Sequence, residues 1–229
     1  MIAYALLGGP KEEWPIDIKD ILLKAQNNHD LIIGVDRGSL LLEELGITPD
    51  LAVGDYDSLK KAELAQIEHS VADIRYSNPI KNYTDSELMI RIAFEEYQVD
   101  SLVILGATGG RIDHFLVNMF MMLNPDVRQY SEKIVLLDRQ NKIRYYLPGQ
   151  HKIAWENYPY FGVATLSAVD NLTIAEAKYH LENYSVAYPQ IFSSNEFADK
   201  GKDFKLSFAK GMVSVIFSKD LERFYHLNN

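Results

Sequence analysis

The sequence predicts an α/β fold, with an N-terminal three-layer domain built on a mostly parallel sheet and a C-terminal antiparallel β-sandwich domain. Up to about residue 133, apolar strand-like runs alternate with amphipathic helix-like stretches, which is typical of a parallel sheet covered by helices. Beyond that point the chain is made of short β-type runs separated by turn residues. We therefore expect one domain over residues 1–139 and a second over residues 140–229.

In the first domain, the apolar runs at residues 2–7, 31–35, 51–53 and 102–105 predict strands. Apolar residues that recur at the spacing of one helix face predict helices between and after these strands, over residues 16–26, 39–45, 58–68, 84–97 and about 111–123. Ligands of such sheets bind outside the carboxyl ends of the strands. Asp36, Asp55 and the segment 106–110 each follow a predicted strand, so we expect them at one edge of the sheet.

In the second domain, short runs rich in β-branched and aromatic residues predict strands. Pro148-Gly149, Asp170-Asn171 and Lys210-Gly211 predict turns between them. The segment 175–181 is ambiguous between helix and strand. The β-type runs after Lys133 cover residues 134–137, 142–147, 151–155, 161–166, 204–208 and 212–217.

The charge balance bounds the ligands. The chain has 229 residues, 32 of them acidic and 23 basic, and a formal net charge of −9, which argues against broad nucleic-acid binding. A phosphate ligand stays possible, because a divalent cation held by carboxylates can supply the positive charge. The absence of cysteine excludes disulfides and thiolate metal sites. The apolar N-terminal run is too short to span a bilayer, so we expect a cytoplasmic protein without a membrane segment.

Asp55 and Asp57 lie between a predicted strand and a predicted helix. Alternate residues of an extended segment point the same way, so both carboxylates are expected to face one ligand. Two carboxylates suit Mg²⁺, which keeps several waters and completes its shell with substrate phosphates. In the alternative interpretation, Asp57 or Ser58 only caps the following helix, which leaves Asp55 unexplained.

The segment Thr84-Asp85-Ser86-Glu87 has the pattern of a capping box. Glu87 is therefore interpreted as structural. Asp85 favours a helix N-terminus electrostatically and is equally open to a functional role.

The segment Gly106–His114 combines glycines with a cation at the start of a predicted helix. Glycines let backbone amides approach a phosphate closely, and Arg111 offers a planar guanidinium to phosphate oxygens. Asp113 adds a carboxylate, while His114 and Asn118 lie four residues apart and can form either a local hydrogen bond or a ligand contact. An ordinary strand-to-helix turn is the alternative. The P-loop and dinucleotide-binding glycine patterns are both absent.

In this order and at these spacings, four segments resemble the thiamine pyrophosphokinase family: Asp36-Arg37-Gly38, PDLAVGDYDS at 49–58, KNYTDSE at 81–87 and GATGGRIDH at 106–114. The segments LTIAEAKYHL at 172–181 and SSNE at 193–196 are similar to the β-sandwich domain of that family. The resemblance implies an α/β catalytic, ATP-binding domain over 1–139 and a thiamine-binding domain over 140–229. It also implies a homodimer with the thiamine site at the subunit interface.

The resemblance further implies a role for each matched residue. Asp55, Asp57 and Asp85 would hold Mg²⁺ on the ATP phosphates and, with Asp113, form the catalytic set. The thiamine contacts would come from Tyr179, Ser194 and Asn195. The nucleotide contacts would come from Asp36, Gly38, Thr84, Thr108, Gly109, Gly110 and Arg111.

The expected reaction is attack of the thiamine hydroxyl on the β-phosphorus of ATP, with AMP leaving and either Asp57 or Asp85 accepting the proton. Two positions depart from the family pattern: Arg37 stands where glycine is common, and Asn82 where aspartate is usual. Asn82 brings no charge, which keeps a catalytically weakened thiamine- or nucleotide-binding protein as an alternative.

Two enzymatic alternatives also remain. One is a pyrophosphokinase for another small alcohol, such as a pterin. The other is a phosphohydrolase, because Asp55-x-Asp57 is similar to a phosphatase signature. That signature usually carries threonine two positions further on, where this chain has Leu59.

Overall fold

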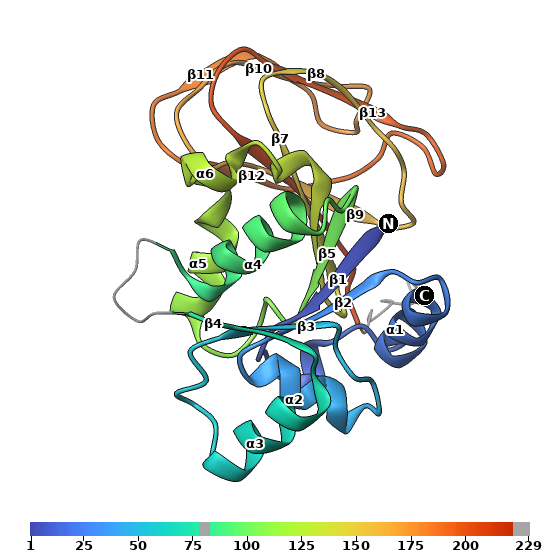
Figure 1. The fold of residues 1–229 in the computed structure, drawn as a ribbon. Helices are drawn as coiled ribbons and strands as arrows, with labels where there is room; N and C mark the ends of the chain where they lie inside the picture. The colour runs from blue at the N-terminus through green and yellow to red at the C-terminus, as the bar shows by residue number, and fades with distance from the viewer. Residues whose placement is uncertain (78–82, 222–229) are drawn as a thin grey trace, which may run out of the picture. The chain divides into compact units, whose positions relative to one another are not determined.

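The protein forms two compact units in a computed structural model that describes residues 1–77 and 83–221 (Figure 1). The first unit is Met1–Arg139 and the second begins at Gln140. The first contains a parallel sheet with helices, and the second contains antiparallel sheets. The predicted fold class is confirmed.

Six strands form the sheet of the first unit, in the order β6-β5-β1-β2-β3-β4, and each neighbouring pair is parallel. All residues of β2 are buried, as expected for a strand covered on both faces. The strands are β1 (Ile2–Leu6), β2 (Leu31–Val35), β3 (Leu51–Gly54), β4 (Asp73–Tyr76), β5 (Ser101–Leu105) and β6 (Ile134–Leu137).

The helices of this unit lie on both sides of its sheet, with α1 and α2 on one side and α4 and α5 on the other (Figure 1). Leu22 of α1 and Leu42 of α2 pack against Leu6 and Ile32 of the sheet. None of the helices in the described residues has the length and apolar composition that a membrane crossing needs. The α-helices are α1 (Ile18–Asn27), α2 (Arg37–Glu44), α3 (Lys61–Ser70), α4 (Asp85–Arg91), α5 (Ile112–Phe120) and α6 (Pro125–Arg128), with 3-10 turns at Lys11–Glu13, Met121–Leu123 and Ser131–Lys133 and a π-helical turn at Ile92–Glu96.

The strand order reverses between β1 and β5. From β1 the chain adds β2, β3 and β4 on one side, and then returns to add β5 and β6 on the other. The loops after β1 and β5 therefore leave in different directions, which opens a crevice at the carboxyl edge of the sheet. The two loops touch at their bases, where the Gly9 amide donates to the Gly106 carbonyl oxygen at 3.0 Å.

Several elements of this unit differ from the sequence prediction, among them the short helix α6, which was not predicted. Strand β4 was not predicted, because none of its residues is fully buried and its sequence, DIRY, lacks an apolar run. The helix expected over residues 84–97 is α-helical only to Arg91 and continues as the π-helical turn Ile92–Glu96.

The second unit contains two antiparallel sheets, in the orders β12-β9-β14-β7 and β11-β10-β13-β8. Their inner faces form one apolar core, in which Phe161 of one sheet stacks on Phe204 of the other with ring centroids 4.1 Å apart. The strands are β7 (Asn141–Tyr146), β8 (Gly149–Ile153), β9 (Tyr160–Thr165), β10 (Val169–Ala175), β11 (Leu181–Val186), β12 (Gln190–Asn195), β13 (Phe204–Phe208) and β14 (Val213–Ser218).

Three predictions for this unit were wrong or incomplete. Asp170-Asn171 lies inside β10 and not in a turn: Asn171 has φ 58° where the register shifts, so a bulge produces the turn-like sequence. The ambiguous segment 175–181 is not helical, and Ala177 pairs with Phe197 in an isolated bridge. Strands β11 and β12 were missed because most of their residues are polar or exposed.

Candidate active site

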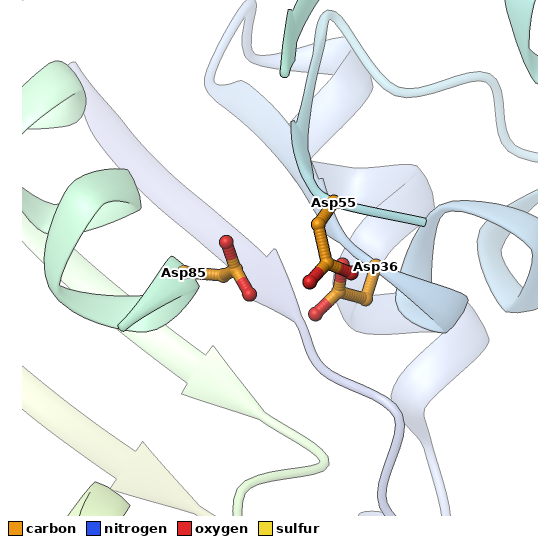
Figure 2. Close-up of side chains that lie close together, drawn as sticks. All are labelled: Asp36, Asp55 and Asp85. Carbon is orange, nitrogen blue, oxygen red and sulfur yellow. The ribbon is translucent and has the colours of Figure 1, made fainter. Parts of the chain in front are cut away.

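Three carboxylates from different elements meet at the carboxyl edge of the parallel sheet, where their side chains point toward one another (Figure 2). Asp36 follows β2, Asp55 follows β3 and Asp85 is the first residue of α4. One oxygen from each carboxylate lies within 4.8 Å of the others, and all three residues are partly buried. Hard oxygen ligands at this spacing are suited to a divalent cation.

Asp36 reaches this cluster through an unusual backbone conformation. Its φ of 49° and ψ of −122° are sparsely populated by residues other than glycine and cost about 1–3 kcal/mol. A β-carbon at Gly54 would lie 2.0 Å from Asp36 Oδ1, so the carboxylate needs glycine beneath it. The Tyr56 amide donates to the same oxygen at 3.5 Å. The glycine before Asp55 is therefore part of the site.

The cluster carries uncompensated negative charge. Burial, followed by the negative charge of Asp85 and then that of Asp55, raises the pKa of Asp36 from 3.8 to about 7. The Tyr56 amide opposes this rise by donating to the carboxylate. When carboxyl groups gather without a cation, their negative charges repel one another, so not all of the groups ionise together.

The raised pKa predicts how Asp36→Asn changes stability with pH. In EDTA, which removes divalent cations, the Asp36 carboxyl loses its proton near pH 4 in the unfolded state and only near pH 7 in the folded state. This group therefore makes the wild type less stable as the pH rises between these two values. We expect Asp36→Asn to raise the free energy of unfolding by about 1–2 kcal/mol at pH 8 and by little at pH 4. Thermal unfolding of both proteins in EDTA measures the difference, and an equal difference at both pH values would contradict the assigned pKa.

Asp57 is not part of the carboxylate cluster. Tyr56 has φ 57°, so the segment is not extended and the alternation argument that placed Asp55 and Asp57 on one face was wrong in its premise. The Asp57 side chain is exposed and lines the adjacent cleft, while its amide donates to Asp55 Oδ1 at 3.1 Å. The position of Asp57 shortly after β3 could not by itself reveal this local turn.

A cleft of about 580 Å³ lies beside the cluster. The loops after β1 and β5 form one part of its wall, and the starts of α2 and α4 form another. Gly38 is not on the wall: a β-carbon there would lie 1.9 Å from the Leu6 carbonyl oxygen, so this glycine lets α2 pack against β1. The lining includes Gly8, Gly9, Asp36, Arg37, Asp57, Thr84, Asp85, Gly106, Thr108, Gly109, Gly110, Arg111 and His114.

The loop after β5 has a fixed conformation. Gly109 and Gly110 have φ values of 75° and 64°, which strain residues with side chains. The Thr108 hydroxyl donates to Asp138 Oδ2 at 2.7 Å, and Asp138 is buried directly after β6. Sequence reasoning missed Asp138, although its position after a strand is the signal that had singled out Asp36 and Asp55.

Arg111 and Asp113 form an ion pair at the start of α5. Arg111 Nε and Nη2 donate to the two oxygens of Asp113 at 3.1 and 2.5 Å, and both side chains are largely exposed. This pair lowers the pKa of Asp113 to about 2. Asp113 thus neutralises the guanidinium of Arg111, a residue that lines the cleft, and is not a member of the carboxylate cluster.

Asn118 connects two parts of the cleft wall, the loop after β5 and the start of α4. Its side-chain amide donates to the Ala107 carbonyl oxygen at 3.0 Å and accepts from the Ser86 hydroxyl at 3.3 Å. The residue is buried, whereas His114 is exposed at the cleft. The bonds given for Asn118 thus go to residues distant in sequence and not to His114, while both residues line the cleft, so a ligand contact stays a prediction.

The predicted capping box at the start of α4 is confirmed. The Thr84 hydroxyl accepts from the Glu87 amide at 3.2 Å, and Glu87 Oε2 accepts from the Thr84 amide at 2.8 Å. Asn124 donates to the other Glu87 oxygen at 2.9 Å, so Glu87 is structural and orients the helix that carries Asp85. Lys81 and Asn82 lie outside the described residues.

In the second unit, the three residues expected at thiamine lie close in the fold. The Tyr179 amide donates to Asn195 Oδ1 at 3.0 Å, and Asn195 Nδ2 donates to the Tyr179 carbonyl oxygen at 2.8 Å. Asn195 is buried, whereas the Tyr179 side chain is 57% exposed. Ser194 has φ 59° and lines a hollow of about 480 Å³ together with Tyr160, Ser193 and Asp220.

Comparison with known proteins decides the family. Residues 22–136 match the model described as the catalytic domain of thiamin pyrophosphokinase, and residues 150–213 match its vitamin B1 binding domain. The chain is 36% identical to thiamine pyrophosphokinase of Bacillus subtilis over 216 residues, which are 93% of this chain and 96% of that protein. This chain belongs to the thiamin pyrophosphokinase family.

Solved structures agree with membership of the thiamin pyrophosphokinase family. A thiamin pyrophosphokinase family protein from Enterococcus faecalis is 35% identical, with a TM-score of 0.84 over 96% of this chain and 100% of that one. A protein from Lactobacillus plantarum is 38% identical, with a TM-score of 0.86 over 96% and 99% of the two chains. The chain is thus a diphosphotransferase that acts as a thiamine pyrophosphokinase.

Proposed function

We propose that this chain transfers the terminal diphosphoryl group of ATP to the hydroxyl of thiamine with the help of Mg²⁺, and releases AMP and thiamine diphosphate. The observation that carries the proposal is the cluster of Asp36, Asp55 and Asp85 at the edge of a cleft between glycine-rich loops. The family supplies the transferred group and the acceptor. ATP as donor and Mg²⁺ as cation are the parts that we infer.

The residues of the cluster fit Mg²⁺. Ligands on opposite sides of an octahedral ion with bonds of about 2.1 Å lie about 4.2 Å apart, so oxygens within 4.8 Å can close on one ion by small side-chain rotations. After burial, the negative charges of Asp85 and Asp55 raise the pKa of Asp36, and a cation would compensate these charges. Asp36, Asp55 and Asp85 would hold the ion, whose chemistry is to neutralise charge on the phosphate oxygens.

The nucleotide phosphates are proposed to lie along the loop after β5. The Gly109 and Gly110 backbone can approach phosphate oxygens closely, because these two residues carry no side chains, and Arg111 lines the same wall. The Thr108 hydroxyl already donates to Asp138, so Thr108 acts by fixing the loop. Thr84, likewise occupied as a helix cap, holds Asp85 in place.

In the proposed reaction the thiamine hydroxyl oxygen forms a bond to the β-phosphorus while the bond from that phosphorus to the α-phosphate oxygen breaks. AMP takes the bonding electrons, and the hydroxyl proton passes to a carboxylate of the site. Positioning and charge neutralisation supply most of the acceleration in such transfers. The cationic thiazolium ring of thiamine is matched by the acidic character of the site.

Asp57 has two possible roles that one titration separates. Its exposed carboxylate lines the cleft outside the cluster, where it can join the cation or accept the proton. If Asp57 is a ligand, Asp57→Asn raises the Mg²⁺ concentration for half-maximal activity. If Asp57 accepts the proton, the variant lowers kcat and leaves that concentration unchanged.

Thiamine is proposed to contact the second unit near Tyr179 and Ser194. The exposed Tyr179 ring offers an aromatic face, and Ser194 lines a hollow that Asp220 also lines. Asn195 is buried, and its amide is bonded to the backbone of Tyr179. We therefore assign Asn195 to positioning rather than direct contact.

The proposal is tested by incubating the protein with ATP, Mg²⁺ and a panel of acceptor alcohols that includes thiamine and a pterin alcohol. We expect AMP and thiamine diphosphate in equal amounts with thiamine only. Preference for the pterin alcohol would show that it, and not thiamine, is the acceptor. Phosphate release without an acceptor would indicate a hydrolase. Tight thiamine and ATP binding without products would indicate a binding protein.

We also propose that the chain is a homodimer, and expect α5 to be buried in it. Ile112, Leu116 and Phe120 are 74, 45 and 37% exposed, and their four-residue spacing places them on one helix face. Leu116→Glu should shift the molar mass measured by light scattering from dimer to monomer, because it would bury a charge. Leu23→Glu, at a similarly exposed leucine of α1, is the control; a dimer that survives Leu116→Glu would exclude this face.

The cytoplasmic location expected from the sequence stays a prediction. Microscopy of the tagged full-length chain in its own cell would test it.

A further inference from the structure

We propose that Arg37 is a further residue of the active site and binds the diphosphoryl group that is transferred. This inference rests on the proposed function, since it requires a nucleoside triphosphate in the cleft. It concerns a position where the sequence showed only that a cationic side chain replaces a common glycine.

Arg37 is placed where a cation can meet the transferred group. It is the first residue of α2, directly after Asp36, and it lines the same cleft as Asp36 and Asp85. Its β-carbon lies 3.4 Å from the position that a β-carbon on Gly8 would take, so the side chain starts against the glycine loop after β1. Its exposed side chain is therefore anchored beside both the carboxylate cluster and a glycine-lined wall.

The guanidinium of Arg37 has no partner in the part of the chain that the structure describes: among residues 1–77 and 83–221 it takes part in no hydrogen bond and no ion pair. Arg111, the other arginine that lines the cleft, is held by Asp113 through two hydrogen bonds of 3.1 and 2.5 Å. An anion entering the cleft can therefore bind Arg37 without first displacing a carboxylate, which is not true of Arg111.

The negative charge of the site favours a further cationic side chain for the phosphates. Three carboxylates carry up to three negative charges, so one divalent cation among them leaves no net positive charge for the phosphates. A guanidinium presents a planar fork that matches two phosphate oxygens. Arg37 follows β2 and Arg111 follows the loop after β5, with β1 between these strands, so the two arginines approach from different sides.

The adjacency of Arg37 to Asp36 assigns it to a particular part of the nucleotide. Phosphates next to the carboxylate cluster are those whose charge the proposed cation neutralises, and in this reaction they are the transferred β- and γ-phosphates. Arg37 therefore favours a triphosphate or diphosphate ligand over a nucleoside monophosphate. It is a specificity-determining residue for the length of the phosphate chain.

Calorimetric titration of wild type and Arg37→Ala with ATP, inorganic pyrophosphate and AMP, all at one Mg²⁺ concentration, tests the assignment. We expect the variant to bind ATP and pyrophosphate about 10- to 100-fold more weakly, as for the loss of charged hydrogen bonds, and AMP within twofold of wild type. Arg37→Lys should fall between them, because it keeps the charge and loses the fork. Lys19→Ala, which removes an exposed positive charge on α1 outside the cleft lining, should change none of the three affinities.

Unchanged ATP and pyrophosphate binding by Arg37→Ala would overturn the inference while leaving the proposed function standing. An equal loss for AMP would also overturn it, because Arg37 would then contact the departing nucleotide. A wild type that binds neither ATP nor pyrophosphate would instead remove the proposed function itself. Unfolding temperatures serve as the folding check, since this exposed side chain has no partner to lose within the described residues.

Discussion

Asp55→Asn and Asp85→Asn are each expected to lower kcat/KM for thiamine diphosphate synthesis by about 10²- to 10³-fold. Each substitution removes one negative oxygen ligand from a cluster whose members lie within 4.8 Å, so both cation binding and charge neutralisation suffer. Initial rates over a range of thiamine concentrations, at saturating ATP and fixed Mg²⁺, measure the loss. A partial recovery at high Mg²⁺ is expected, because a weaker site fills at higher concentration.

The same variants should keep their fold. Removing one of several like charges in a partly buried cluster relieves repulsion, so the unfolding temperature in EDTA should not fall. Asp20→Asn, which removes an exposed carboxylate from α1, is the matched control and should retain full activity. Activity of Asp55→Asn or Asp85→Asn within threefold of wild type would exclude that residue as a ligand.

Asn195→Ala is expected to raise the KM for thiamine about 10- to 100-fold and to leave the KM for ATP within twofold. The buried Asn195 amide accepts from the Tyr179 and Glu196 amides at 3.0 and 2.8 Å and donates to the Tyr179 carbonyl oxygen at 2.8 Å. Alanine leaves these backbone groups without partners, which costs about 2–4 kcal/mol and lowers the unfolding temperature by about 5–12 °C. Kinetics and thermal unfolding of the purified variant measure both effects.

A more conservative substitution tests whether Asn195 acts by positioning its neighbours. Asn195→Asp keeps the oxygen that accepts from two amides and loses the donor to Tyr179, so its KM for thiamine should lie between those of wild type and Asn195→Ala. Glu182→Ala, an exposed polar residue of β11, controls for general loss of surface polarity and should be silent. If Asn195→Ala is destabilised but binds thiamine normally, the residue supports the fold and has no part in the site.

The sequence predicted the edge of the sheet where the site lies because that edge follows from strand direction alone. Asp36 and Asp55 follow neighbouring parallel strands, and the structure brings their carboxylates together. The capping box at Thr84 and Glu87 was also predictable, since it depends on residues three apart. Local spacing and parallel topology thus determine much of where the site lies.

Features that depend on contacts distant in sequence could not be predicted. The Asp36 carboxylate passes directly over Gly54, the last residue of the neighbouring strand β3. The Thr108 hydroxyl is bonded to Asp138, thirty residues away along the chain. These arrangements arise from packing between elements, which a single sequence does not display.

The same limit explains the differences in secondary structure. Strand β4 is short and polar and exists because β3 offers it a parallel partner. Strands β11 and β12 likewise form on neighbouring strands, although most of their residues are polar or exposed. The bulge at Asn171 produces a turn-like sequence inside β10. Pairing across the sheet therefore overrides the local preference of each of these segments.

The location of a bound divalent cation tests the account most directly. Crystals grown with Mn²⁺ and a non-hydrolysable ATP analogue allow the cation to be located by its anomalous scattering. We predict one peak within coordination distance of carboxylate oxygens of Asp36, Asp55 and Asp85, next to the phosphates of the analogue. A cation bound elsewhere, with these three carboxylates free of metal while the analogue fills the cleft, would contradict the account.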